Sequence, residues 1–217
     1  MTGSARWAAA FAAIAAVAGG TSACGGGGTT ASVPAAPGAA LTDRVLGASE
    51  LGLAGYTASR EPVVAQGTED AEAADSCRPI RDESLKVLRG SGFQAAARRG
   101  FQADHGAALS AVWQFATPAG ASAWEKEVLA QTQRTYPGCV PAGVTRTAYR
   151  ARRFAGLPAG TLTYASQTAP DGSSEAWNLL FTDGRFVYEV GVVGAPGRVS
   201  SAAVIGAARR QWQRRNG

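Results

Sequence analysis

The 217-residue sequence contains a single histidine, His105, and only three cysteines, Cys24, Cys77 and Cys139. His105 lies in a segment of turn composition, so we interpret it as a solvated turn residue and not as a base or a metal ligand. The sequence then has no Ser-His-Asp triad, Cys-His dyad or zinc site, and the nucleophile motif GxSxG is absent. The glycine-rich segment lacks the Gly-Lys-Ser/Thr ending of a phosphate-binding loop. We therefore expect no enzyme activity, no metal and no cofactor.

Long apolar runs are absent as well. The longest run, WAAAFAAIAAVA at residues 7–18, has 12 residues, whereas a transmembrane helix needs ~20. A short positively charged start precedes this run, and a segment of small residues follows it and ends at Cys24. This order is typical of an export signal, which predicts a signal peptide over residues 1–23.

The residues before Cys24 are Gly20, Thr21, Ser22 and Ala23. Here the chain resembles bacterial lipoproteins, in which a box of small residues ends in an invariant lipid-modified cysteine. The resemblance implies a diacylglycerol group on Cys24, cleavage before it, and acylation (palmitate) of the new N-terminus. Several acyl chains anchor a protein stably, since each buried CH₂ contributes about 0.8 kcal/mol and one chain holds only marginally. Ordinary signal cleavage followed by secretion is the alternative.

The remaining two cysteines and the following segment fit an exported protein. If Cys24 carries lipid, Cys77 and Cys139 remain as a pair, which predicts a disulfide in an oxidising compartment. Residues 24–40 contain the run GGGGTTASVPAAPGAA and lack large apolar side chains. We expect them to form a disordered linker. Residues 41–217 are long enough for a single extracytoplasmic domain.

Secondary-structure patterns predict the fold of this domain. Strand-like runs occur at residues 93–102, 107–116, 144–150, 160–168, 175–182 and 185–193. Thr117-Pro118 predicts the start of a helix that ends near residue 134, and Asp183-Gly184 predicts a two-residue hairpin turn. A last helix is expected over residues 200–215, with Ala202, Ile205, Ala208 and Trp212 buried. The order predicts an α+β fold, with about five to six antiparallel strands and helices packed on one face.

Lysine is scarce, because 19 of the 21 basic residues are arginine, and the net charge is +5. This bias is expected of a GC-rich actinobacterial genome more than of a nucleic-acid-binding protein. Outside the cytoplasm, we expect anionic lipids, acidic glycans or envelope proteins as partners, and no nucleic acid. Arg150, Arg152 and Arg153 form a dense cluster with two interpretations. They form an anion-binding site, or they are surface charges whose stems cover apolar edges.

Two longer segments carry a family resemblance. They are FATPAGASAWEKEVLAQTQRTYPGC at residues 115–139 and SSEAWNLLFTDGRFVYEVGVV at residues 173–193. With these segments, residues 41–217 resemble the extracellular sensor domain of mycobacterial-type serine/threonine kinases, and equally a PsbP/Mog1-like lipoprotein domain. The resemblance implies a non-catalytic ligand-binding, sensing or protein-interaction role at the extracytoplasmic face of the cell membrane. The alternatives are an envelope hydrolase with paired carboxylates and a purely structural envelope protein.

Overall fold

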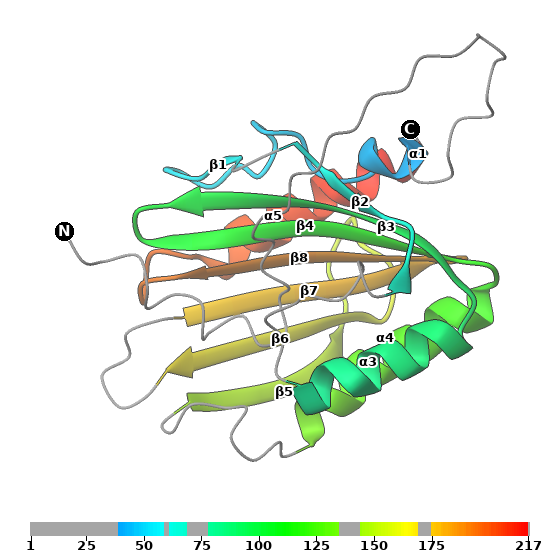
Figure 1. Ribbon diagram of the computed structural model, residues 1–217. Helices are drawn as coiled ribbons and strands as arrows, with labels where there is room; N and C mark the ends of the chain where they lie inside the picture. The colour runs from blue at the N-terminus through cyan, green and yellow to red at the C-terminus, as the bar shows by residue number, and fades with distance from the viewer. Residues whose placement is uncertain (1–38, 59–60, 69–77, 135–143, 169–174, 217) are drawn as a thin grey trace, which may run out of the picture.

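The centre of the molecule is an eight-stranded antiparallel sheet (Figure 1). This computed structural model describes residues 39–58, 61–68, 78–134, 144–168 and 175–216. Six long strands lie side by side in the order β3 (Phe93–Ala103), β4 (Gly106–Phe115), β8 (Phe186–Gly194), β7 (Glu175–Asp183), β6 (Thr161–Thr168) and β5 (Val144–Arg152). Two short strands, β1 (Thr57–Ala58) and β2 (Val63–Ala65), both pair with β3.

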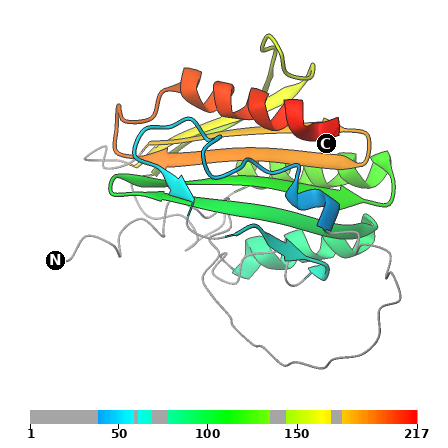
Figure 2. The ribbon, with the colours of Figure 1, turned by 90° about the horizontal axis from the view of Figure 1, so that it is seen from above.

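Helices cover both faces of the sheet, as the view from above shows (Figure 2). On one face lie α3 (Arg78–Gly90) and α4 (Pro118–Gln133), and their apolar side chains pack in one cluster with that face. On the other face lies α5 (Ser201–Gln213), which continues into the short helix η2 (Arg214–Asn216). The first helix, α1 (Ala39–Thr42), and the chain after it pack into this second cluster.

The predicted α+β class and the antiparallel sheet are confirmed, whereas two details were wrong. The sheet has eight strands because β1 and β2 extend its edge, and helices cover both faces instead of one. The second layer of helices is explained by β4, because all of its residues are buried and both of its faces are therefore covered. Its large side chains face α4, and small residues such as Ala108 and Ser110 alternate with them. The chain after α1 approaches this second face closely enough for the Leu46 N–H to donate to Ser110 Oγ, at 3.0 Å.

The sequence predicted the start of α4 correctly, but it did not predict the buried side of α5. Thr117 caps α4 by accepting a hydrogen bond from the Gly120 N–H at 3.1 Å, and Pro118 follows it, as predicted. The buried stripe of α5 differs from the prediction, because Val204, Ala207 and Gln211 are buried with the predicted Ala208. Ala202 is exposed, and Trp212 is partly buried. The helix is therefore rotated about its axis relative to the predicted stripe.

Aromatic side chains fill both layers. On the α5 side, Phe181 and Tyr188 stack with their ring centroids 5.3 Å apart, and Trp212 packs edge-on against both. On the other side, Trp113 of β4 lies 6.1 Å from Trp124 of α4, centroid to centroid. Such pairs add ~0.5–1.5 kcal/mol to the free energy of unfolding beyond the area that they bury. The sheet and its two helical layers therefore form one rigid platform.

A tyrosine joins β4 and β8 at one end of the sheet. Tyr56 Oη donates a hydrogen bond to the Val193 carbonyl at 2.9 Å, and burial raises the pKa of Tyr56 to about 12. Its ring packs edge-on against His105, in the predicted β3–β4 turn. His105 is half-buried by this contact, not fully solvated. Directly beneath the tyrosine, Gly106 pairs with Gly194.

Several predicted features lie outside the described residues. These are the signal peptide, nearly all of the linker, and all three cysteines, so the lipid anchor and the Cys77–Cys139 disulfide remain predictions. No helix within the described ranges is both long enough and apolar enough to cross a membrane.

Candidate anion-binding pocket

An open pocket of about 660 Å³ lies where β8 begins, on the face of the sheet that α5 covers. Its lining comes from three parts of the chain: Ala40, Leu41, Arg44, Gln94, Gln114, Arg185 and Phe186. The residues Ala40, Leu41 and Arg44 belong to α1 and the turn after it. The two glutamines belong to β3 and β4, and Arg185 and Phe186 belong to the β7–β8 hairpin. The pocket has the volume of an ordinary small-molecule site, ~300–1,000 Å³.

The β7–β8 hairpin places Arg185 at the rim of the pocket. The predicted turn is present but shifted by one residue: Asp183 pairs with Phe186, so Gly184 and Arg185 form the turn. Gly184 has a φ of +55°, a left-handed conformation that glycine adopts readily. Arg185 is therefore exposed at the tip instead of lying inside a strand.

Two guanidinium groups lie over one aromatic ring. The Arg44 guanidinium carbon is 4.2 Å from the centroid of Phe186, and that of Arg185 is 5.4 Å away. Arg44 also donates to Tyr188 Oη at 2.8 Å. Burial raises the pKa of Tyr188 although Arg44 opposes the shift, so the phenol stays neutral at physiological pH. Within the described ranges, neither arginine is within ion-pair distance of a carboxylate.

Two glutamines, the exposed Gln94 and the buried Gln114, add amide groups to the lining of the pocket. The register of β3 against β4 shifts between Phe93 and Ala95. Gln94 lies at this irregularity, where a bulge redirects a side chain. Its Oε1 accepts a hydrogen bond from Gln114 Nε2 at 3.1 Å, and Gln114 itself is buried. The pocket thus offers cationic and amide donors and no acid, base or nucleophile in its lining. Chemically, these donors can hold an anion.

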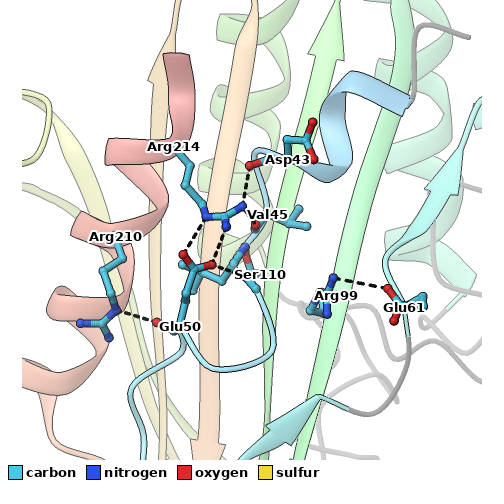
Figure 3. A network of polar contacts seen from close by, with 10 residues as sticks. Asp43, Val45, Glu50, Glu61, Arg99, Ser110, Arg210 and Arg214 are labelled. Carbon is cyan, nitrogen blue, oxygen red and sulfur yellow. Dashed lines mark hydrogen bonds and ion pairs between the residues drawn. The ribbon is translucent and has the colours of Figure 1, made fainter. Parts of the chain in front are cut away.

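Arg210 of α5 and Arg214 of η2 hold the segment that carries Arg44 (Figure 3). Arg214 forms an ion pair with Glu50 at 2.9 Å and donates to the carbonyls of Asp43 and Val45, at 2.8 and 3.2 Å. Arg210 donates to the carbonyls of Glu50 and Leu51. We call Arg210 and Arg214 the arginine clamp. Because the clamp fixes the backbone on both sides of Arg44, it positions this wall of the pocket.

The predicted arginine cluster lies outside the pocket. Arg150 and Arg152 occupy β5 opposite Thr163 and Thr161, and Arg153 follows the strand. All three side chains are exposed. Since β5 lies three strands from β8, the cluster is roughly 15 Å from the pocket at the usual strand spacing.

The described acidic residues between positions 61 and 83 form ion pairs away from the pocket. Of the acids between residues 61 and 83, Glu61 pairs with Arg99, Asp82 with Arg78, and Glu83 with Arg134. These pairs are on the surface and away from the pocket lining. Across the described residues, no group of three or more histidine, cysteine or acidic side chains is placed to hold a metal ion.

The pocket residues were not among the predicted site residues. Arg44 follows a short helix, Arg185 follows a turn motif, and Gln94 and Gln114 belong to two strands of a hairpin. No local pattern marks these residues, because only the pairing of β4 with β8 and the packing of α1 bring them together. The one available signal was the Asp183-Gly184 turn, which predicts an exposed residue next to it.

The α+β fold of this chain also occurs in an extracellular domain of known structure. The chain is similar in structure to the extracellular domain of PknH, a kinase from Mycobacterium tuberculosis, with a TM-score of 0.55 and 14% sequence identity. The match covers 83% of this chain and 97% of that domain. It confirms the predicted resemblance to kinase sensor domains at the level of the fold. No protein-family description and no curated protein match the sequence.

Proposed function

We propose that this chain is a lipid-anchored lipoprotein of the cell envelope whose extracytoplasmic domain binds an anionic ligand without catalysis. The observation that carries the proposal is the pair Arg44 and Arg185 over Phe186, in an open pocket without a carboxylate. The shared fold with a kinase extracellular domain supports a sensing or binding role. A chain that supplies no catalytic group at this site transmits or stores its ligand instead of converting it.

The pocket favours binding over the two alternative functions. A hydrolase of the glycosidase type needs two carboxyl groups about 5–9 Å apart in one cleft, and the lining of this pocket has none. A purely structural protein has no need for two uncompensated cations beside a ring. Guanidinium groups bind phosphate and carboxylate oxygens with charge-assisted hydrogen bonds, often in pairs.

The anchor is the second part of the proposal. Lipid on Cys24 and a linker from there to residue 38 would hold the domain at a root-mean-square distance on the order of 20 Å from the membrane. The odd cysteine count supports this assignment, because it leaves Cys77 and Cys139 as a pair. Their disulfide would stabilise the domain by roughly 4 kcal/mol in the chain-entropy model.

Anion binding can be measured by isothermal titration calorimetry with phenyl phosphate, which combines a dianion with a ring. The protein is the chain from residue 24 to 217 with Cys24→Ser. We expect Arg185→Ala to weaken binding at least about tenfold, since a hydrogen bond to a charged group contributes ~1.5–3 kcal/mol. Arg198→Ala, which removes an exposed arginine beyond the end of β8, is the matched control. Equal affinities for the wild type and both variants would rule out the pocket as the site.

Membrane anchoring can be measured by fractionating cells that express the full chain. We expect the wild type in the membrane fraction, labelled by a palmitate analogue, and Cys24→Ser unlabelled and in the aqueous fraction. Loss of the acyl chains removes nearly all of the membrane affinity, which scales as ~0.8 kcal/mol per buried CH₂. If Cys24→Ser stays in the membrane to the same extent as the wild type, the anchor is assigned wrongly. Wild-type protein in the medium would support secretion.

A further inference from the structure

One end of the sheet collects several chain segments that are distant in sequence. Because the strands are antiparallel, β3 and β8 begin where β4 and β7 end, and β5 ends at the same side. The β7–β8 turn, the C-terminal end of α5 and α1 lie at this end too (Figure 2). We call it the hairpin end of the domain.

The hairpin end is strongly basic. Its arginines are Arg44, Arg152, Arg153, Arg185, Arg214 and Arg215. The acids beside them are Asp43, Glu50 and Asp183. Glu50 pairs with Arg214 and Asp183 with Arg215. In the described part of the chain, the other four arginines have no carboxylate within ion-pair distance.

The opposite end of the sheet is not strongly basic. It carries Asp104 in the β3–β4 turn and Glu175 at the start of β7, with Arg198 after β8. The Glu175 carboxylate accepts hydrogen bonds from Trp177 Nε1 and from the Gly197 N–H. Among the described residues at the two ends of the sheet, positive charge is therefore concentrated at the hairpin end.

The linker joins the domain at the hairpin end. The described chain begins at Ala39, and Ala40 lines the pocket. A disordered linker of the length of residues 24–38 would reach on the order of 20 Å, whereas the ten residues of β4 extend for roughly 33 Å. A lipid on Cys24 therefore keeps the hairpin end near the membrane, and the opposite end is farther away by the length of a strand.

We infer that the hairpin end docks on the anionic lipid surface to which Cys24 is anchored, with headgroup phosphates contacting Arg152, Arg153 and Arg185. This inference rests on the proposed lipid anchor and names the partner of the same pocket. Acyl chains and a basic patch act together, because the anchor supplies a high local lipid concentration and the arginines supply the orientation. Bound in this way, the pocket faces the headgroups, and Phe186 and Leu41 lie close to the membrane interface.

The inference can be tested by co-sedimentation with vesicles, using the chain from residue 24 to 217 with Cys24→Ser, so that no acyl chain contributes. The vesicles contain phosphatidylcholine alone or with phosphatidylglycerol at about a third of the lipid. We expect binding to the anionic vesicles only, with a marked decrease at high salt. Each arginine near such a surface contributes about fivefold to the affinity, so Arg152→Glu with Arg153→Glu should reduce binding at least about 25-fold.

The matched control is the charge reversal Arg198→Glu, compared with Arg185→Glu at the hairpin end. We expect a loss of at least about fivefold for Arg185→Glu and little change for Arg198→Glu. Equal losses for both variants would mean attraction by net charge alone and would overturn the docking surface. Failure to bind anionic vesicles while phenyl phosphate still binds would also overturn it, and would leave the proposed function intact. Arg152 and Arg153 lie outside the pocket, so their variants separate the two proposals.

Discussion

Replacing Gly106 by alanine should lower the free energy of unfolding of the domain by at least about 3 kcal/mol. A Cβ atom at this position would overlap the Val193 carbonyl, and would lie 2.5 Å from Tyr56 Oη and 2.8 Å from Gly194 Cα. Two of these three obstacles are backbone atoms of the paired strand, so they cannot rotate away. The end of the β4–β8 pair must separate, and the Tyr56 hydrogen bond to Val193 is lost with it.

The measurement is equilibrium unfolding in guanidinium chloride, followed by tryptophan fluorescence. Gly90→Ala is the matched control, because a Cβ at the last residue of α3 would meet nothing within 4 Å. There we expect an unchanged or slightly higher stability, since alanine lowers the entropy of the unfolded chain by the equivalent of ~0.4–1 kcal/mol. Similar midpoints for Gly106→Ala and Gly90→Ala would contradict the close approach of the two strands.

Removing the clamp residue Arg214 should lower the free energy of unfolding by about 2–4 kcal/mol and also weaken the pocket. Arg214→Ala leaves the carbonyls of Asp43 and Val45 without this donor, and leaves Glu50 without its ion pair. The released segment carries Arg44, so the affinity for phenyl phosphate should fall although Arg214 does not line the pocket. Denaturant unfolding and calorimetry of the same variant measure the two effects.

Two further variants separate geometry from charge. Arg214→Lys keeps the charge but presents a point donor instead of a planar fork, so we expect it to recover less than half of the lost stability. Arg198→Ala removes the same charge from an exposed site and should leave both the stability and the affinity unchanged. If Arg214→Ala lowers the stability and leaves phenyl phosphate binding untouched, then the clamp does not position Arg44.

Local sequence signals were sufficient for most of the framework. The Thr117-Pro118 pair predicted where α4 begins. The turn expected before β4 was found, and the turn expected before β8 was found shifted by one residue. These features depend on neighbouring residues alone: a hydroxyl caps a helix, and glycine permits a left-handed backbone. For the same reason, the six long strands were recognisable from their composition.

The second helical layer and the pocket depend on contacts between distant segments. Ser110 and Ala108 have the small size of solvent-facing strand residues, but here their size admits the chain after α1. The rotation of α5 follows from the partners of Arg210 and Arg214, which are some 160 residues away in the sequence. The pocket joins residues from position 40 to position 186. A single sequence contains no short-range trace of such contacts.

The arginine clamp also determines how the domain would carry mechanical load. A pull on Cys24 would reach the folded domain at Ala39 and pass along the segment that Arg210 and Arg214 hold. The force would therefore be borne first by α5, the last helix of the chain, and not by the hydrogen bonds between strands. Force applied from the membrane would displace the pocket residues around Arg44 before it separated the strands of the sheet. If Cys24 carries the proposed anchor and the pocket binds the proposed ligand, tension and binding would act on the same few contacts.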